Sequence, residues 1–230
     1  MSDAWSKIAL RYAKVTDDVR KRFLHQAIED AIQTDVPERF SCLDYGCGPG
    51  DLAIRIANLF DSLVLVDSAP DALAEASKKL GSTVVTLNPS EFFATDDVFD
   101  TVIFSLVLTT ISSDSEVEFI LCNLASRIKN GGRVIIGTTH PCFTFSAHSQ
   151  VPYSSSGKPY TVQVEPGLEI TEYHRPLSCV LDLLAKANLR ILRTREVYDD
   201  PAYYVDRGEE PRRFAGALPM FLVMTCDSPS

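Results

Sequence analysis

The sequence predicts an α/β fold in which helices cover both faces of a seven-stranded, mostly parallel sheet. Short runs of aliphatic and β-branched residues alternate with helical patterns along most of the chain, as in parallel sheets whose strands are joined by helices. Two of these runs, 99–108 and 132–139, are almost continuously apolar, which is typical of central strands buried on both faces. A length of 230 residues suits one large domain, so we expect residues 1–230 to form a single domain.

A helical segment precedes the first expected strand. It begins near Thr16, which two aspartates follow, and it ends before Pro37. Its apolar residues recur at helical spacing on one face, and these are Val19, Phe23, Ala27 and Ala31. We expect residues 1–36 to form a helical lid or wall beside the sheet.

The following elements alternate in the order expected of a parallel sheet. The expected strands are 39–46, 62–67, 82–88, 99–108, 132–139, 189–197 and 217–226. The helices between them are expected to begin near Asp51, Ser68, Ser113 and Leu177. Both of these serines are followed three residues later by an acidic residue, Asp71 or Glu116, which is the spacing of a helix-opening capping box.

After His140 the alternation stops. Residues 141–176 are rich in proline, serine, glycine and tyrosine, and a connection of this length in a compact domain is usually functional or disordered. We expect this insert after the fifth strand to form a small cap together with the N-terminal helix.

Charge and cysteine usage limit the partners. A net charge of −9 repels polyanions, which argues against nucleic acid and acidic membrane surfaces. The six cysteines show neither CxxC pairs nor histidine-spaced ligand patterns, so we expect reduced thiols and no metal site. The N-terminal residues lack the apolar core of a signal peptide, and the apolar runs are too short to span a bilayer. We therefore expect a cytoplasmic monomer or homodimer that acts on a small molecule.

The most informative stretch is CLDYGCGPGDL, residues 42–52. Gly46, Gly48 and Gly50 lie between an apolar strand and a helix, where free N–H groups and bare Cα atoms allow a nucleotide to approach closely. The dinucleotide fingerprint GxGxxG would need a third glycine at the position of Asp51. Because a carboxylate there would face a pyrophosphate, a ligand without phosphate, such as S-adenosylmethionine, fits better.

The segment LDYGCGPG resembles the glycine-rich motif of class I S-adenosylmethionine-dependent methyltransferases, and the resemblance extends from about Tyr12 to Cys226. It implies a Rossmann-like fold, S-adenosylmethionine as cofactor and methyltransferase activity. In that family an acidic residue at the end of the second strand binds both ribose hydroxyls, which implies this role for Asp67 in LVLVD. The predicted cofactor-binding residues are Tyr12, Asp44, Gly46, Cys47, Gly48, Gly50, Asp67, Ser68, Asn88, Pro89, Ser105 and Leu106.

Two positions depart from the family pattern. Asn88 stands where the family usually has an aspartate to meet the adenine amino group, although the Asn carbonyl can accept the same hydrogen bond. Thr109 and Thr110 replace the usual histidine pair after the fourth strand, so no base is available there.

Simpler interpretations stay open for several of these residues. The three glycines could serve only a tight turn, and Asp67 could be only a helix cap. Asn88 followed by Pro89 could be ordinary turn chemistry. Tyr12 could reach the methionine carboxylate or could equally be a packed lid residue.

Methyl transfer needs little from the protein beyond alignment and one general base, because the sulfonium brings the reactivity. His140 in THPCF is the candidate catalytic base, since it follows the fifth strand at the carboxyl edge of the sheet. A hydrogen-bonded structural histidine at the strand end is the equal alternative. His174 is a second candidate, but the neighbouring Arg175 would depress its basicity.

The methyl acceptor is identified mainly by exclusion. The sequence lacks both the pattern of exocyclic-nitrogen methylation in DNA and the ligand cluster of magnesium-dependent catechol methylation. The expected substrate-binding residues are His140, Phe143, Tyr153, Tyr160, Tyr173 and His174. The aromatic side chains of the insert could wall an apolar pocket, so we expect an aromatic or heterocyclic acceptor methylated on oxygen or nitrogen. HPCF and YHRPLS resemble small-molecule members of the family, including bacterial natural-product methyltransferases. The same aromatic side chains could instead be core or subunit contacts.

Two other functions compete with this interpretation. A nicotinamide-dependent oxidoreductase would share the sheet, but it predicts GxGxxG and usually a Tyr-x-x-x-Lys or a separate catalytic domain, which the sequence lacks. A non-catalytic S-adenosylmethionine-binding protein would keep Asp67 and the glycines but lack a workable acceptor pocket.

Overall fold

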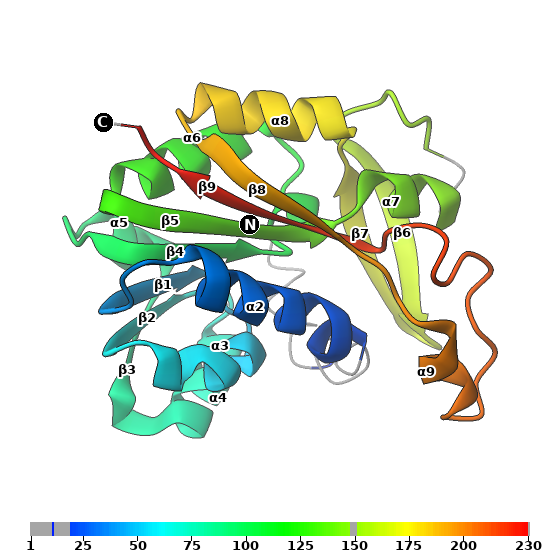
Figure 1. The fold of residues 1–230 in the computed structure, drawn as a ribbon, viewed down its shortest axis with the longest axis horizontal. Helices are drawn as coiled ribbons and strands as arrows, with labels where there is room; N and C mark the ends of the chain where they lie inside the picture. Colours follow the sequence, from blue (N-terminus) through cyan, green and yellow to red (C-terminus); the bar gives the residue numbers. More distant parts are fainter. Residues whose placement is uncertain (1–10, 12–18, 148–150, 230) are drawn as a thin grey trace.

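The computed structural model describes residues 11, 19–147 and 151–229, and within them seven strands form one sheet in the order β3-β2-β1-β4-β5-β9-β8 (Figure 1). The strands are β1 (Ser41–Tyr45), β2 (Ser62–Val66), β3 (Val84–Leu87), β4 (Phe99–Ser105), β5 (Ile128–Thr139), β8 (Arg190–Val197) and β9 (Phe221–Asp227). The first five are parallel, and β9 lies antiparallel between β5 and β8. The predicted seven-stranded, mostly parallel sheet is therefore confirmed.

Helices cover both faces of the sheet, as predicted (Figure 1). One face carries α2 (Gln26–Asp35), α3 (Asp51–Ile56) and α4 (Pro70–Leu80). The other carries α5 (Pro89–Phe93), α6 (Asp114–Ser126) and α8 (Leu177–Lys186). Strand alternation divides the apolar runs between the two cores: Val102 and Phe104 face α6 and α8, whereas Ile103 packs with the helices of the opposite face.

The most deeply buried face of the N-terminal helix is shifted from the expected one and keeps Ala31 as the shared residue. A π-helical turn, η1 (Arg20–His25), runs directly into α2. The fully buried residues are Leu24, Ile28, Ala31 and Ile32, whereas Val19, Phe23 and Ala27 are only partly buried. Burial of the larger aliphatic side chains of Leu24, Ile28 and Ile32 removes more apolar surface from water than burial of the expected face would. The expected start near Thr16 lies outside the described residues.

The two expected capping boxes have different outcomes. Ser113 opens α6 and accepts a hydrogen bond from the Glu116 N–H at 3.3 Å. Ser68 does not cap α4, which begins at Pro70 after Ala69 and has no side-chain cap. The N–H of Ala69, just before the helix, donates to Asp67 Oδ1 at 2.8 Å.

The described part of the insert is folded. It contains α7 (Pro141–Ala147) and a hairpin of β6 (Lys158–Glu165) and β7 (Leu168–His174), which form their own antiparallel sheet. The hairpin stands at the carboxyl ends of the parallel strands, and β7 lies beside η4 (Leu108–Thr110), the turn after β4 (Figure 1). The remaining short elements are η2 (Ala57–Leu59), η3 (Gly81–Thr83) and α9 (Pro201–Val205). None of the described helices has the length and apolar character needed to cross a membrane.

Candidate active site

A cavity opens at the carboxyl ends of β1, β2 and β4, over the glycine-rich loop. Its wall consists of Arg20, His25, Asp44, Gly46, Cys47, Gly48, Pro49, Asp51, Leu52, Asp67, Ser68, Ala69, Ser105, Leu106, Val107, Thr110 and Glu172. The structure thus brings together most of the predicted cofactor-binding residues, namely Asp44, Gly46, Cys47, Gly48, Asp67, Ser68, Ser105 and Leu106.

The three glycines of the loop serve three different needs, and all have left-handed backbone conformations. A Cβ on Gly46 would lie 2.2 Å from Val107 Cγ2, so this glycine permits close packing. A Cβ on Gly50 would lie 3.0 Å from Ala76 Cβ, so this residue faces α4 and not the cavity. At Gly48 an added Cβ meets no described atom within 4 Å, so this position leaves space beside the cavity.

Asp67 connects the two loops that border the cavity. Its Oδ2 accepts a hydrogen bond from the Gly48 N–H, and its Oδ1 accepts one from the Ala69 N–H, both at 2.8 Å. Burial raises the pKa of Asp67, while these backbone N–H groups and Ser68 partly oppose the rise. The carboxylate is therefore fixed at the end of β2, on the wall of the cavity.

Asp44 is the most deeply buried acid of the wall, with 1% of its surface exposed. Its Oδ2 has no hydrogen-bond partner among the described residues. Burial, followed by the charge of Asp67, raises the pKa of Asp44 to about 7. An unpartnered buried carboxyl oxygen is costly unless a ligand supplies a donor or a cation.

The backbone is strained directly after β4, at a residue that lines the cavity. Leu106 has a φ of 58°, a left-handed conformation that costs free energy for a non-glycine residue. Its N–H donates to the Gly137 carbonyl at 2.8 Å. The loop that follows contributes Val107 and Thr110 to the wall.

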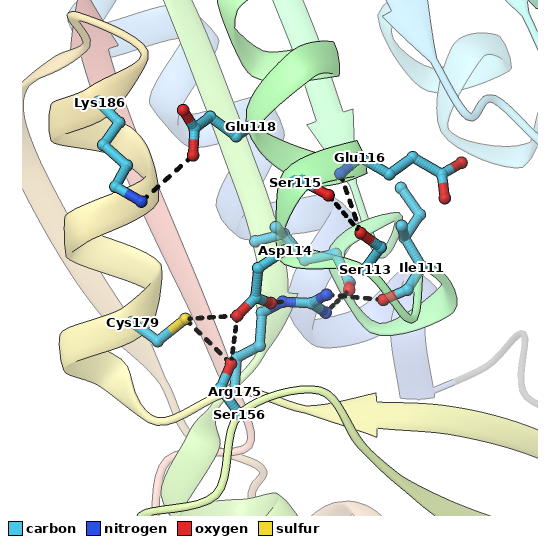
Figure 2. A network of polar contacts seen from close by, with 11 residues as sticks. Ile111, Ser113, Asp114, Ser115, Glu116, Glu118, Ser156, Arg175, Cys179 and Lys186 are labelled. Atoms are coloured by element: carbon cyan, nitrogen blue, oxygen red, sulfur yellow. Dashed lines mark hydrogen bonds and ion pairs between the residues drawn. The ribbon is translucent and has the colours of Figure 1, made fainter.

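Arg175, directly after β7, holds this loop in place (Figure 2). Its guanidinium donates to the carbonyls of Leu108 at 2.5 Å and Ile111 at 2.7 Å, and to Asp114 Oδ1 at 2.8 Å. Although burial alone would raise it, the pKa of Asp114 is lowered by hydrogen bonds from Ser156 and Arg175 and by the Arg175 charge. The insert and the loop after β4 are thus joined by one buried cation.

Sequence analysis missed two wall residues from the N-terminal segment, Arg20 and His25. Residues five apart on an α-helix point about 140° apart, whereas the wider π-helical turn of η1 brings both to the cavity. Burial and then the charges of Arg20 and Arg55 lower the pKa of His25 to about 3, so its ring is neutral. The His25 Nδ1 has no partner among the described residues.

Sequence analysis also missed Glu172, the contribution of β7 to the wall. The side chain is buried, and the Tyr160 hydroxyl donates to Glu172 Oε2 at 2.5 Å. Burial raises the pKa of Glu172, while the Tyr160 hydrogen bond and the Arg20 charge act in the opposite direction. Recognition of the alternation in LEITEYH as a strand would have placed Glu172 on its buried face.

Some predicted cofactor-binding residues do not line the cavity. Asn88 Oδ1 accepts from the Glu91 N–H at 3.0 Å, and Glu91 Oε2 accepts from the Asn88 N–H at 2.8 Å. This is a complete capping box at the start of α5, with Pro89 in its first turn. The contacts of Asn88 are therefore those of local turn and helix-cap chemistry. Tyr12 lies outside the described residues.

His140 follows β5, as predicted, but the structure does not bring it to the cavity. Its Nδ1 accepts a hydrogen bond from the Cys142 N–H at 3.1 Å, and its Nε2 lies 3.5 Å from Glu196 Oε1. Burial lowers the pKa of His140, while Glu196 opposes this. A neutral ring whose Nδ1 accepts carries its proton on Nε2, so these contacts leave no free lone pair for a base.

The other expected substrate-binding side chains do not line the cavity. His174 Nε2 bonds to the Tyr153 carbonyl at 2.8 Å, and the Tyr153 hydroxyl accepts from the Leu177 N–H at 3.3 Å. Phe143, Tyr153, Tyr160, Tyr173 and His174 are all absent from the described wall. Tyr160 alone among them contacts a wall residue through a described hydrogen bond, to Glu172.

Comparisons with known proteins agree on the fold. Residues 42–132 match a family model described as a methyltransferase domain, and no curated protein sequence matches the chain significantly. An S-adenosylmethionine-dependent methyltransferase from Clostridium acetobutylicum has a TM-score of 0.66 at 16% identity, over 99% of this chain and 100% of that chain. One from Mesorhizobium loti has a TM-score of 0.59 at 18% identity, over 86% and 95%.

DhpI, solved as a complex with SAM and HEP, has a TM-score of 0.65 at 17% identity, over 97% of this chain and 94% of that chain. At these identities the likeness establishes a shared fold. The residues matched by the family model, 42–132, include the loop and the strand ends that form most of the cavity. The chain therefore has the fold of S-adenosylmethionine-dependent methyltransferases, and residues 42–132 match a methyltransferase domain.

Proposed function

We propose that this enzyme methylates a small molecule in the cavity over the glycine-rich loop, with Asp67 binding the ribose hydroxyls of S-adenosylmethionine. The observation that carries this placement is the carboxylate of Asp67, fixed beside the open space at Gly48. A carboxylate accepts well from two vicinal hydroxyls. The open side of Gly48 gives the cofactor room to lie against the loop.

The methionine end of the cofactor fits the remaining charges of the wall. Asp44 supplies a buried carboxyl oxygen that lacks a described partner, which suits the cofactor ammonium group. Arg20 supplies a guanidinium, which suits the cofactor carboxylate. Because Arg20 comes from the expected lid, 1–36, and Glu172 from the expected cap, 141–176, both segments act as parts of one site in this proposal.

The proposed acceptor is a polar small molecule methylated on nitrogen or oxygen. The expectation of an aromatic or heterocyclic natural product depended on the aromatic side chains of the insert. Phe, Tyr and Trp do not occur in the described wall, which instead carries carboxylates, an imidazole and hydroxyls. We retain the cytoplasmic setting as part of the proposal, since the cysteines are free thiols.

Calorimetric titration of Asp67→Ala with S-adenosylmethionine and its demethylated product, S-adenosylhomocysteine, tests the cofactor placement. Loss of two charge-assisted hydrogen bonds should cost roughly 2–4 kcal/mol in binding. Gly48→Val should weaken binding as well, because its side chain would enter the open space beside the loop. Wild-type affinity in both variants would refute this placement. A nicotinamide cofactor serves as the negative control.

A further inference from the structure

Glu172 is a buried acid on the inner face of β7. Leu168, Ile170, Glu172 and His174 share the buried face of the strand, and Glu172 is 8% exposed. A buried carboxyl group is costly without a compensating partner. Because Glu172 lies on the wall of the cavity, a bound ligand can be that partner.

The hairpin fixes this carboxylate through one oxygen. Tyr160 and Glu172 are direct cross-strand partners in the register of β6 and β7, and the tyrosine hydroxyl donates to Oε2 at 2.5 Å. Within the described part of the chain, no other hydrogen bond to the Glu172 carboxylate is formed. The second oxygen, Oε1, is therefore left for a ligand while the side chain stays in place.

Glu172 reaches the cavity from the opposite side of β1 to Asp67. Asp67 stands at the end of β2, whereas β7 lies beside η4, which follows β4 on the other side of β1. In the proposed function the ribose lies at Asp67 and the methionine group near Asp44, whereas Glu172 borders the same cavity from β7, beside the turn that follows β4. This placement rests on the proposed function.

We propose that Glu172 binds the methyl acceptor through Oε1 and takes its proton, and that the acceptor is a small molecule with an N–H or O–H nucleophile. The acceptor nitrogen or oxygen forms a bond to the methyl carbon as the carbon–sulfur bond breaks. The electron pair of the broken bond stays on sulfur, which becomes a neutral thioether. The proton of the acceptor moves to the Glu172 carboxylate, so charge and atoms balance.

The electrostatics of Glu172 suit this role. Burial raises the pKa of the carboxyl group above its ordinary value, which makes the carboxylate a stronger base near neutral pH. A negative charge in the wall also attracts acceptors that arrive as cations, such as amines. The same charge repels carboxylate acceptors, which need no base.

The test compares Glu172→Gln with Glu169→Gln, a matched control on the exposed face of the same strand. Purified proteins receive S-adenosylmethionine and a panel of primary and secondary amines, alcohols, phenols, thiols and carboxylic acids, with mass detection of the methylated product. We expect the wild type to methylate an amine, alcohol or phenol. Glu172→Gln should lower kcat/KM for that acceptor by roughly 10²–10⁴-fold and keep the S-adenosylhomocysteine Kd within twofold. Glu169→Gln should match the wild type.

Several outcomes would overturn this assignment. They are wild-type turnover of the N–H or O–H acceptor by Glu172→Gln, transfer only to thiols or carboxylic acids, and no transfer to any N–H or O–H compound. If Glu172→Gln fails to fold, Tyr160→Phe replaces it, because loss of the Oε2 hydrogen bond should lower turnover and keep S-adenosylhomocysteine affinity. Absence of S-adenosylhomocysteine binding to the wild type would instead refute the proposed function.

Discussion

Replacement of Asp44 by asparagine should stabilise the ligand-free enzyme, and increasingly so as the pH rises. In the folded protein burial raises the pKa of Asp44 from 3.8 to about 7, whereas the unfolded chain has the ordinary value. Between these two pKa values the folded state keeps a proton that the unfolded state has lost, so the free energy of unfolding falls as the pH rises. Three units at 1.36 kcal/mol each give roughly 4 kcal/mol.

Urea unfolding of the wild type and Asp44→Asn at several pH values measures this difference. Asparagine has the same shape and does not titrate, so the advantage of the variant should be near zero below pH 4 and reach roughly 4 kcal/mol above pH 7. Asp67 keeps its own raised pKa in both proteins, which leaves a shared pH dependence that cancels in the comparison. Parallel stability profiles of the two proteins would refute the buried, unpartnered state of Asp44.

The same substitution should weaken the cofactor site. If Asp44 receives the ammonium group of S-adenosylmethionine, its loss removes a charged hydrogen bond worth roughly 1.5–3 kcal/mol, which corresponds to roughly 10- to 100-fold in Kd. Stability and cofactor affinity then change in opposite directions. A variant that gains stability and binds as tightly as the wild type would show that Asp44 does not contact the cofactor.

Two further predictions concern residues outside the wall. His140→Ala should lower stability by roughly 1–2 kcal/mol through loss of the hydrogen bond from Cys142 at the start of α7, with turnover close to wild type; a 10²-fold loss of turnover at unchanged affinity would restore the base role. Arg175→Met should raise the S-adenosylhomocysteine Kd about tenfold by releasing the carbonyls that fix the loop after β4. Asp114→Asn keeps those carbonyl contacts and controls for destabilisation. If calorimetry gives Arg175→Met the same S-adenosylhomocysteine Kd as the wild type, the positioning role of Arg175 is wrong.

The sheet and the cofactor loop could be predicted because both depend on local sequence. Apolar runs specify buried strands, and a glycine such as Gly46 is required wherever a side chain would collide with a neighbour. Asp67 could be predicted for the same reason, because its place at the end of a strand follows from the run before it. The capping role of Asn88 was also visible locally, since Glu91 follows it at capping-box spacing.

The acceptor side of the site could not be predicted in the same way, because it depends on how distant segments pack. His140 lies beside Glu196 of β8, at 3.5 Å, and this neighbour comes from far along the chain. His25 reaches the cavity only because of a π-helical turn, which apolar spacing does not reveal. Glu172 depends on the register of a hairpin, where a shift of one residue would turn it to the opposite face.

Three acids of the cavity wall differ from the paired acids elsewhere in this protein. Asp100 pairs with Lys129 at 3.0 Å, and despite burial its hydrogen bonds to Ser41 and Lys129 lower its pKa. Of the four wall acids, Asp51 pairs with Lys79 at 2.7 Å. The other three, Asp44, Asp67 and Glu172, come from separate segments, and burial raises the pKa of each. A scaffold gains stability by pairing its carboxylates, so three acids with raised pKa values around one cavity lower the stability of the empty enzyme. In the proposed site, the cofactor ammonium group at Asp44, the ribose hydroxyls at Asp67 and a proton-donating acceptor at Glu172 offset that cost at the three positions where it arises.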